Sequence, residues 1–393
     1  MRPSLSAAES ILERVWGFPG FRTAQRRVVL AALCGRDCLA MLPTGGGKSL
    51  CYQVPALALP GLTVVVSPLI SLMQDQVAAL QRRGVAAEYL SSTQAGDVRR
   101  NVLEALRAGR LKLLYVAPER LAQMVPIVAG RVSLLAVDEA HCISEWGHDF
   151  RPHYRAIGGF HRAVGSPPML ALTATATPAT RADILGVLGL RSPVRVATSF
   201  DRPNLHFRVQ PFAAEGPRLA RLAERLRRLE ESAVIYQPTR NRTDGIAGIL
   251  SRWGFPAAPY HAGLPGAERT RLLDRFMSGD ARIIVATNAF GMGIDKPDVR
   301  LVVHLGIPAR PESYWQEAGR AGRDGRPARC ELMWVPGDLR LARQMAMSRK
   351  QAPAAAAGFA AMERYLTTTG CRRRVLLEYL GETPIACGGC DNC

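Results

Sequence analysis

The chain has 393 residues, with 51 lysines and arginines against 33 aspartates and glutamates, which gives a formal net charge of +18 at pH 7. This length suits two or three domains, and the charge favours a polyanionic partner, nucleic acid before an acidic membrane surface; a solvated basic surface in an arginine-rich proteome is the alternative. The sequence has neither a run of about 18 apolar residues nor the layout of a signal peptide. We therefore expect a cytoplasmic protein, associated with the nucleoid if it is bacterial.

Short apolar runs alternate with helical patterns through the first half of the chain. Continuous apolar strands between helices indicate a parallel sheet that is covered on both faces. We therefore predict a doubly wound α/β domain over residues 1–203. The runs, rich in valine and leucine, lie at residues 37–43, 62–68, 111–118, 133–140 and 169–177.

A glycine-rich loop, LPTGGGKS (42–49), follows the first of these strands and precedes a helical pattern. Its glycines let backbone N–H groups cradle phosphates, its lysine can reach the terminal phosphates and its serine can hold Mg²⁺. The general motif has a further glycine where this sequence has Leu42, and a glycine-rich turn without function is the alternative. The predicted nucleotide-binding residues of this loop are Thr44, Gly45, Gly46, Gly47, Lys48 and Ser49.

Two acids, Asp138 and Glu139, end the strand in LLAVDEAH. A nucleotide hydrolase needs a carboxylate at a strand end to hold magnesium, directly or through water, and Asp138 is placed for this. Glu139 is then expected to orient or deprotonate the attacking water. Paired acids after a strand are often only a solvated loop, but a GGGKS loop in the same predicted sheet favours a nucleotide site. The segment that follows places Trp146, Phe150 and Tyr154 among polar and basic neighbours, which is unusual for core residues.

The same pattern of strands and helices restarts after a polar connector at residues 199–205. Apolar runs at 232–239, 281–288 and 299–306 predict a second, smaller α/β domain over 204–338. Before them, leucines at helical spacing in residues 218–231 have arginines opposite. An amphipathic helix with a solvated basic side explains this pattern, with a nucleic-acid-binding face as the alternative.

Two arginines, Arg320 and Arg323, lie among glycines in YWQEAGRAGRDG (314–325) of the second domain. Phosphoryl transfer profits from an arginine that meets the charge of the transition state. If these arginines face the nucleotide, hydrolysis is tied to closure of the two domains.

Four cysteines close the sequence, after helical patterns that begin near residue 340. Their spacing, C-x15-C-x2-C-x2-C, suits a tetrahedral Cys₄ zinc site without an open position, while a disulfide pair is the alternative. We predict a helical zinc-binding module over residues 339–393, in which residues 352–358 form either a helix or a flexible join. The expected zinc ligands are Cys371, Cys387, Cys390 and Cys393, and the expected magnesium ligands are Ser49 and Asp138.

These motifs, in this order, resemble those of superfamily 2 helicases, and most closely the RecQ-type DNA helicases. LPTGGGKS is that family's own phosphate loop, so Leu42 fits the family pattern. WGFPGFRTAQ (16–25) resembles the family's adenine motif, which implies that Gln25 reads the base, Arg22 supports it and Phe18 stacks on it. Further matching motifs lie at 67–76, 115–121, 171–177, 260–264, 286–300 and 316–325, the last beginning with Gln316 as a further nucleotide contact.

The resemblance also gives the aromatic segment a role, because in this family it senses single-stranded DNA and relays its presence to the ATP site. Stacking on bases is then expected of Trp146, Phe150 and Tyr154, with contacts to the DNA backbone from His148 and Arg151 and a bridge from His141 to the nucleotide site. For Phe150 and Tyr154, packing beneath the loop is the alternative. A departure from the family pattern at Gln237 and Pro238 leaves DNA contacts there undefined.

The resemblance implies two tandem RecA-like domains and an ATP- and Mg²⁺-dependent helicase that moves 3′ to 5′ on single-stranded DNA and opens tailed or forked duplexes in recombination and repair. It also implies a zinc module. We further expect a monomer, and contact with single-strand-binding protein. The family commonly continues into a winged-helix domain, whereas this sequence ends at Cys393, so we expect either a truncated form or a minimal member. A single-strand translocase that remodels DNA complexes with little unwinding and an RNA helicase of the wider superfamily are the alternatives.

Overall fold

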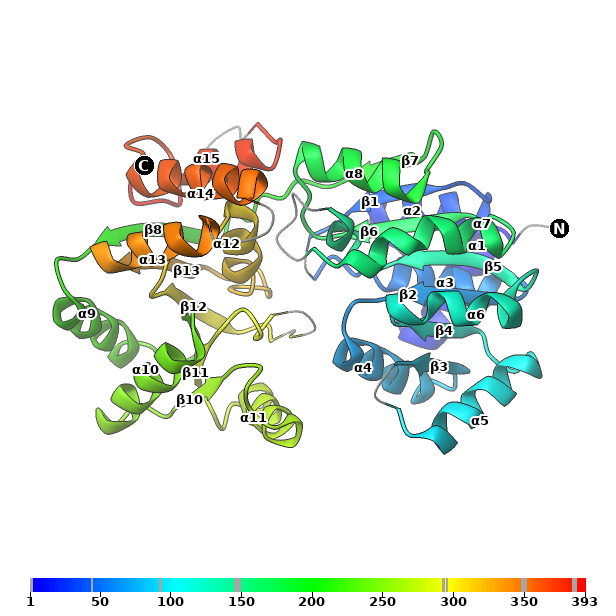
Figure 1. Cartoon of the computed structure of the whole chain (residues 1–393), viewed down its shortest axis with the longest axis horizontal. Helices are drawn as coiled ribbons and strands as arrows, with labels where there is room; N and C mark the ends of the chain where they lie inside the picture. Colours follow the sequence, from blue (N-terminus) through cyan, green and yellow to red (C-terminus); the bar gives the residue numbers. More distant parts are fainter. Residues whose placement is uncertain are drawn as a thin grey trace. The chain divides into compact units, whose positions relative to one another are not determined.

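The computed structural model describes residues 3–43, 45–91, 94–144, 150–291, 294, 296–347, 352–383 and 387–393. The chain divides into two compact units, residues 1–200 and 201–393, and each is a parallel sheet with helices (Figure 1). The predicted fold class, two tandem RecA-like domains and a helical four-cysteine module, is confirmed. The finer division at 203 and 338 stays a prediction. None of the described helices has the length and apolar character that a membrane span requires.

The described part of the first unit holds a seven-stranded sheet in the order β3-β4-β2-β5-β6-β1-β7, with all neighbours parallel. The five predicted strands are the inner ones, buried on both faces, which explains their continuous apolar sequences. The two edge strands are only partly buried and therefore gave no apolar run. The strands are β1 (Cys38–Met41), β2 (Leu62–Val66), β3 (Ala87–Leu90), β4 (Leu113–Val116), β5 (Val132–Val137), β6 (Met169–Thr173) and β7 (Val194–Ala197).

Helices cover this sheet, and the first three of them contact one another. Buried Leu12, Val28 and Val54 belong to one core cluster, so the first three helices pack together against the sheet. The helices are α1 (Leu5–Trp16), α2 (Thr23–Leu33), α3 (Leu50–Ala58), α4 (Ile70–Gln81), α5 (Gly96–Arg107), α6 (Leu121–Val128), α7 (Ile157–Ala163) and α8 (Pro178–Leu188), with short 3₁₀ turns η1 (Pro118–Arg120), η2 (Ala140–Ile143) and η3 (Pro152–Ala156).

The described part of the second unit holds a six-stranded parallel sheet in the order β10-β11-β9-β12-β13-β8. The three predicted apolar strands again lie inside it. The edge strand β8 alternates buried and exposed residues, because one of its faces is open. The strands are β8 (Leu205–Pro211), β9 (Ser232–Tyr236), β10 (Ala257–Tyr260), β11 (Ile283–Ala286), β12 (Val299–His304) and β13 (Ala328–Trp334), with helices α9 (Glu215–Arg227), α10 (Arg240–Arg252), α11 (Gly266–Ser278) and α12 (Pro311–Ala318).

The C-terminal helices pack on this second unit. The undecided stretch at 352–358 is helical, because it begins α14 (Ala352–Thr367). This helix contacts α12, α13 (Pro336–Met347) and α15 (Arg372–Tyr379). The segment after α15 also pairs with the sheet, since Cys390 forms a parallel bridge with Phe207 of β8. The four-cysteine module is therefore continuous with the sheet edge.

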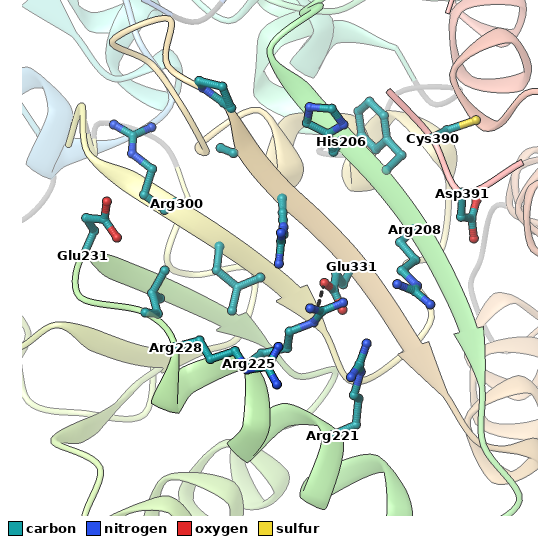
Figure 2. A pocket seen from close by; sticks show the side chains of 16 residues that line it. His206, Arg208, Arg221, Arg225, Arg228, Glu231, Arg300, Glu331, Cys390 and Asp391 are labelled. Atoms are coloured by element: carbon teal, nitrogen blue, oxygen red, sulfur yellow. Dashed lines mark ion pairs between the residues drawn. The ribbon is translucent and has the colours of Figure 1, made fainter. Parts of the chain in front are cut away.

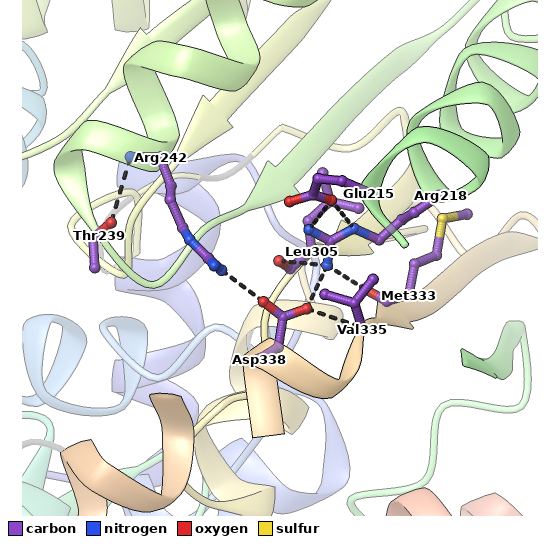
Figure 3. A network of polar contacts seen from close by, with 8 residues as sticks. All are labelled: Glu215, Arg218, Thr239, Arg242, Leu305, Met333, Val335 and Asp338. Carbon is purple, nitrogen blue, oxygen red and sulfur yellow. Dashed lines mark hydrogen bonds and ion pairs between the residues drawn. The ribbon is translucent and has the colours of Figure 1, made fainter. Parts of the chain in front are cut away.

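A buried network of charges joins the second sheet to α13 (Figure 3). Arg218 of α9 is buried and its Nη1 donates to Asp338 Oδ2 at 2.5 Å and to the carbonyl oxygens of Leu305 and Met333 at 3.2 and 3.3 Å. Arg242 of α10 donates to the other carboxylate oxygen of Asp338 at 2.6 Å. The expectation that α9 turns its arginines to solvent is wrong for Arg218, because the chain that returns as α13 brings a buried carboxylate to it.

Candidate active site

The phosphate loop, residues 42–49, begins where β1 ends. Leu42 is buried and its N–H donates to the carbonyl of Thr173 at 3.0 Å, so this position continues the pairing of β1 with β6 and takes a core residue. The loop then turns, with Gly45 and Gly47 at φ 77° and 70°, where residues with a side chain are strained. Lys48 Nζ lies 3.4 Å from the carbonyl oxygen of Leu42, and Ser49 immediately precedes α3.

The predicted adenine motif lies against this loop. Gln25, buried in the first turn of α2, donates from Nε2 to the carbonyls of Gly46 and Gly47 at 3.1 and 3.3 Å. Its Oε1 accepts from the backbone N–H of Arg22, whose own guanidinium donates to Gly45 at 3.2 Å. Phe18 is half exposed, which leaves its ring available for stacking. Gln25 thus already supports the phosphate loop, a contact that the sequence did not predict.

The paired acids follow β5, two strands from β1 in the sheet order. Glu139 has a left-handed backbone, with φ 46°, and its N–H donates to Asp138 Oδ1 at 3.0 Å. Burial, together with the charge of Glu139, raises the pKa of the Asp138 carboxyl to about 7, while the charge of Lys48 opposes the shift. A carboxylate that is costly to ionise without a cation, with the hydroxyl of Ser49 as a second hard oxygen donor, fits the chemistry of Mg²⁺.

A series of polar contacts connects Glu139 to β6, the strand beside β5. His141, buried in η2, has Nδ1 at 3.3 Å from Glu139 Oε2 and at 3.0 Å from the hydroxyl of Thr173. That hydroxyl donates to the carbonyl of Thr175 at 2.9 Å, in the TAT turn after β6. His141 therefore links the expected catalytic acid to a turn at the end of the neighbouring strand.

The described part of the aromatic segment differs from the sequence expectation at one position. Tyr154 does not offer its ring to DNA, because its side chain is fully buried and its hydroxyl donates to the carbonyl of Asp138 at 3.0 Å. Phe150 is partly exposed, and the guanidinium of Arg155 lies 5.4 Å from its ring centroid. Arg151 donates to the carbonyl of Pro68 at 2.5 Å. Trp146 and His148, as well as Thr44 of the phosphate loop, lie outside the described residues.

Both predicted arginines of the second unit lie in residues 319–326, the loop after α12, which we call the arginine loop. Arg320 is buried, and it and Arg323 donate to the carbonyl of Ile294 at 3.5 and 2.5 Å. Gln316 lies on α12, partly exposed. Arg202 and Asn204 also contact this loop, through hydrogen bonds to its backbone. These two residues could not be predicted from the sequence, because their segment has only the pattern of a polar connector.

The four C-terminal cysteines, here the zinc cluster, come together as predicted. The sulfur atoms of Cys371, Cys387, Cys390 and Cys393 all lie within 4.8 Å of one another. Thiolates around a tetrahedral zinc ion stand roughly 3.8 Å apart, given a Zn–S bond of about 2.3 Å. The donor set and its spacing therefore fit zinc.

An arginine-rich pocket of about 810 Å³ lies on the second unit (Figure 2). Arg225 pairs with the buried Glu331 at 2.9 Å, and burial lowers the pKa of Arg225. The lining of the pocket extends from His206 and Arg208 of β8 to Cys390 of the zinc cluster. Arg221, Arg225 and Arg228, in and just after α9, therefore line one pocket, in which Arg225 is paired with Glu331. The other charged residues of the lining are Glu231, Arg300, Arg329 and Asp391.

Three family models match the chain in succession. Residues 22–184 match the DEAD/DEAH box helicase model, residues 218–325 match the helicase conserved C-terminal domain, and residues 336–393 match the RecQ zinc-binding model. The last of these contains all four clustered cysteines.

Several curated proteins are similar over nearly the whole chain. An ATP-dependent DNA helicase RecQ of Haemophilus influenzae is 43% identical over 98% of this chain and 63% of its own length. A RecQ of Bacillus subtilis is 41% identical over 99% of this chain and 67% of its own length, and a probable ATP-dependent DNA helicase RecS of the same species is 41% identical over 96% and 78%. The chain thus spans less than two thirds of the Haemophilus relative.

Solved structures show the same fold at low identity. A DUF1998 helicase MrfA bound to DNA has a TM-score of 0.69 and 20% identity, over 86% of this chain and 52% of that chain. S. cerevisiae Dbp5 bound to RNA and ADP BeF3 also has a TM-score of 0.69, with 17% identity over 92% of each chain. One of these proteins is bound to DNA and the other to RNA, so the fold alone does not select the nucleic acid.

Proposed function

The chain belongs to the RecQ family of DNA helicases, and on this premise we propose that it hydrolyses ATP to move 3′ to 5′ along single-stranded DNA and to open tailed or forked duplexes, in recombination and repair. The observation that supports this most strongly is the succession, in one chain, of the phosphate loop, the paired acids, the arginine loop and the zinc cluster. The cytoplasmic location, the monomeric state and contact with a single-strand-binding protein belong to the same proposal.

In the proposed reaction, the phosphate loop cradles the nucleotide with its backbone N–H groups, and Lys48 leaves the carbonyl of Leu42 for the terminal phosphates. Asp138 and Ser49 hold Mg²⁺, which neutralises charge on the phosphates when bound. Phe18 stacks on the base. Because Gln25 Nε2 already donates to Gly46 and Gly47, donation to the base requires Gln25 to give up one of these contacts, whereas Oε1 has a second lone pair with which to accept from the base.

Glu139 is the proposed general base for the attacking water. Its left-handed backbone turns it away from the path of β5, and His141 lies within 3.3 Å of its carboxylate. Arg320 and Arg323 supply positive charge for the transition state, and Gln316 adds a nucleotide contact. To act on the γ-phosphate the arginines must release Ile294, so the contacts in the structure suit a resting state.

The aromatic segment is the proposed sensor for single-stranded DNA. Trp146 and Phe150 offer rings for stacking, and His148 and Arg151 favour the backbone. Tyr154 has a different role in this proposal, because its hydroxyl ties η3 to the carbonyl of Asp138. A displacement of the segment by DNA can thereby reach the acids directly.

Strand separation tests this function. The chain is given ATP and Mg²⁺ with a 3′-tailed DNA duplex, beside a 5′-tailed duplex and an RNA duplex, and with Lys48→Ala as the inactive control. Unwinding of the 3′-tailed DNA alone is the expected result. Hydrolysis stimulated by single strands without unwinding would support the translocase instead, and unwinding of the RNA duplex would support an RNA helicase.

A further inference from the structure

The arginine loop is held from outside by the linker, residues 201–205. Arg202 donates from Nη1 to the carbonyl of Gly319 at 3.3 Å and from Nη2 to those of Ala321 and Gly322 at 3.1 and 2.7 Å. Asn204 Nδ2 donates to the carbonyls of Gly322 and Arg326 at 2.8 and 2.9 Å. The linker therefore binds the loop backbone on both sides of Arg320 and just before Arg323.

These contacts leave the loop little freedom. Gly322 has φ 54°, and a Cβ atom there would lie 2.5 Å from Asn204 Nδ2 and 2.7 Å from the carbonyl oxygen of Arg326. Arg202 is mostly buried, and its guanidinium fork meets three carbonyls of a single turn. A planar group with several donors fixes the relative position of the atoms that it binds. Arg202 thus determines the direction in which the loop presents its arginines.

The linker is held in turn by the module that contains the zinc cluster. Arg373, buried in the first turn of α15, contacts Asp201 and donates to the carbonyls of Arg202 and Leu205 at 2.8 and 2.6 Å. Cys371 caps the same helix, its sulfur accepting from the N–H of Arg374 at 3.4 Å.

The residues on either side of Cys390 are bonded to β8, the strand that follows the linker. Arg372 donates to Asp391 Oδ1 at 2.9 Å, and Asp391 Oδ2 accepts from the N–H of Val209 at 2.9 Å. Phe207 donates its N–H to the carbonyl of Gly389 at 2.9 Å. The start of α15, and with it Arg373, is therefore held between the zinc cluster and β8.

We propose that Arg202 is a positioning residue for ATP hydrolysis, which holds the backbone of the arginine loop in place while Arg320 and Arg323 exchange Ile294 for the nucleotide, and that Arg373 holds Arg202 in place from the zinc module. This inference rests on the proposed hydrolysis and on Arg320 and Arg323 as its arginines. Because the linker also joins the two units, a displacement of the linker is transmitted to the arginine loop through Arg202.

The inference predicts a specific kinetic change. Arg202→Ala lowers kcat for DNA-stimulated ATP hydrolysis by about 10- to 100-fold, because small displacements of groups that act on a transition state have effects of this size. It leaves KM for ATP within about twofold, because a group that acts mainly in the transition state does not affect substrate binding. The kcat of Arg202→Lys, which keeps the charge but not the planar guanidinium, should lie between those of Arg202→Ala and the unaltered chain. Arg208→Ala, which removes an arginine of the adjacent strand, is the matched control and keeps full kcat.

A double-mutant cycle separates this role from general stability. The kcat values of Arg202→Ala, Arg320→Ala and the double variant are measured with zinc content and the thermal unfolding midpoint of each protein. If Arg202 acts through Arg320, the double variant is little worse than Arg320→Ala alone. Multiplicative effects of the two substitutions would overturn the inference, as would full kcat in Arg202→Ala.

Two further variants complete the test. Arg373→Lys should show a weaker fall in kcat, and an unchanged kcat there would overturn the role of the zinc module. If Arg202→Ala does not fold, Asn204→Ala removes the neighbouring contacts to Gly322 and Arg326 and takes its place in the cycle. Full activity in Arg320→Ala itself would instead overturn the proposed reaction, so the two failures are distinguishable.

Discussion

The acidic end of β5 and the arginine loop are two halves of the proposed chemistry, and they are held in different ways. Asp138, Glu139 and His141 are fixed by their own strand and by Thr173 of the strand beside it. The arginine loop is fixed by Arg202, more than a hundred residues earlier in the chain, and Arg202 by Arg373 near the C-terminus. The acids are thus fixed within one sheet, whereas the arginines depend on the linker and the zinc module.

In this comparison, a large effect is expected at the acids. Glu139→Gln removes the proposed base but keeps the size of the side chain, so kcat for ATP hydrolysis should fall about 100- to 1,000-fold while ATP still binds. Steady-state kinetics and equilibrium binding of a labelled ATP measure the two quantities. Glu104→Gln, on the exposed face of α5 in the same unit, is the control; an equal loss of binding and turnover in Glu139→Gln would argue against a base.

Zinc removal should act on the second region and spare the first. With a chelator, we expect kcat to fall by up to about 10-fold, while ATP binding to the first unit is unchanged. Amide hydrogen exchange provides an independent readout, because the N–H groups of Phe207 and Val209, which are bonded to Gly389 and Asp391, should lose protection. Equal loss of protection in β1 and β5 would indicate general unfolding instead.

The smallest effect is expected where the aromatic segment meets the acids. Tyr154→Phe removes only the hydroxyl that donates to the carbonyl of Asp138, so we expect about 1 kcal/mol lower free energy of unfolding and a weaker stimulation of hydrolysis by single-stranded DNA.

Trp146→Ala should abolish the stimulation of hydrolysis by single-stranded DNA and keep both basal hydrolysis and stability. Denaturant unfolding and hydrolysis with and without DNA distinguish the two variants; full stimulation in Trp146→Ala would argue against a sensor.

The sequence predicted those features that are determined by residues close together in the chain. Most inner strands of the two parallel sheets are apolar, so they were found. The inner strand β13, which contains Arg329 and Glu331, was missed, and the edge strands β3 and β8 have an open side and gave no clear pattern. The phosphate loop and the zinc cluster have their chemistry in consecutive residues and fixed spacings. Both were therefore predictable.

The remaining features depend on partners that are distant in sequence. Tyr154 has the sequence context of a DNA contact, but its hydroxyl meets a carbonyl 16 residues earlier and its ring is buried. Arg218 follows the pattern of a solvated helix face, but it is bonded to Asp338, 120 residues later. Arg202 belongs to a polar connector, and only the folded chain brings it to the arginine loop. Such roles follow from tertiary contacts, which a pattern of residue types does not contain.

The claim that the second unit's arginines serve the ATP of the first is tested most directly by the kcat of Arg320→Ala in DNA-stimulated ATP hydrolysis. We expect a fall of about 1,000-fold, the lower range of the contribution of such an arginine, with KM for ATP nearly unchanged. A kcat equal to that of the unaltered chain would contradict the account, because the arginine loop would then have no part in the chemistry.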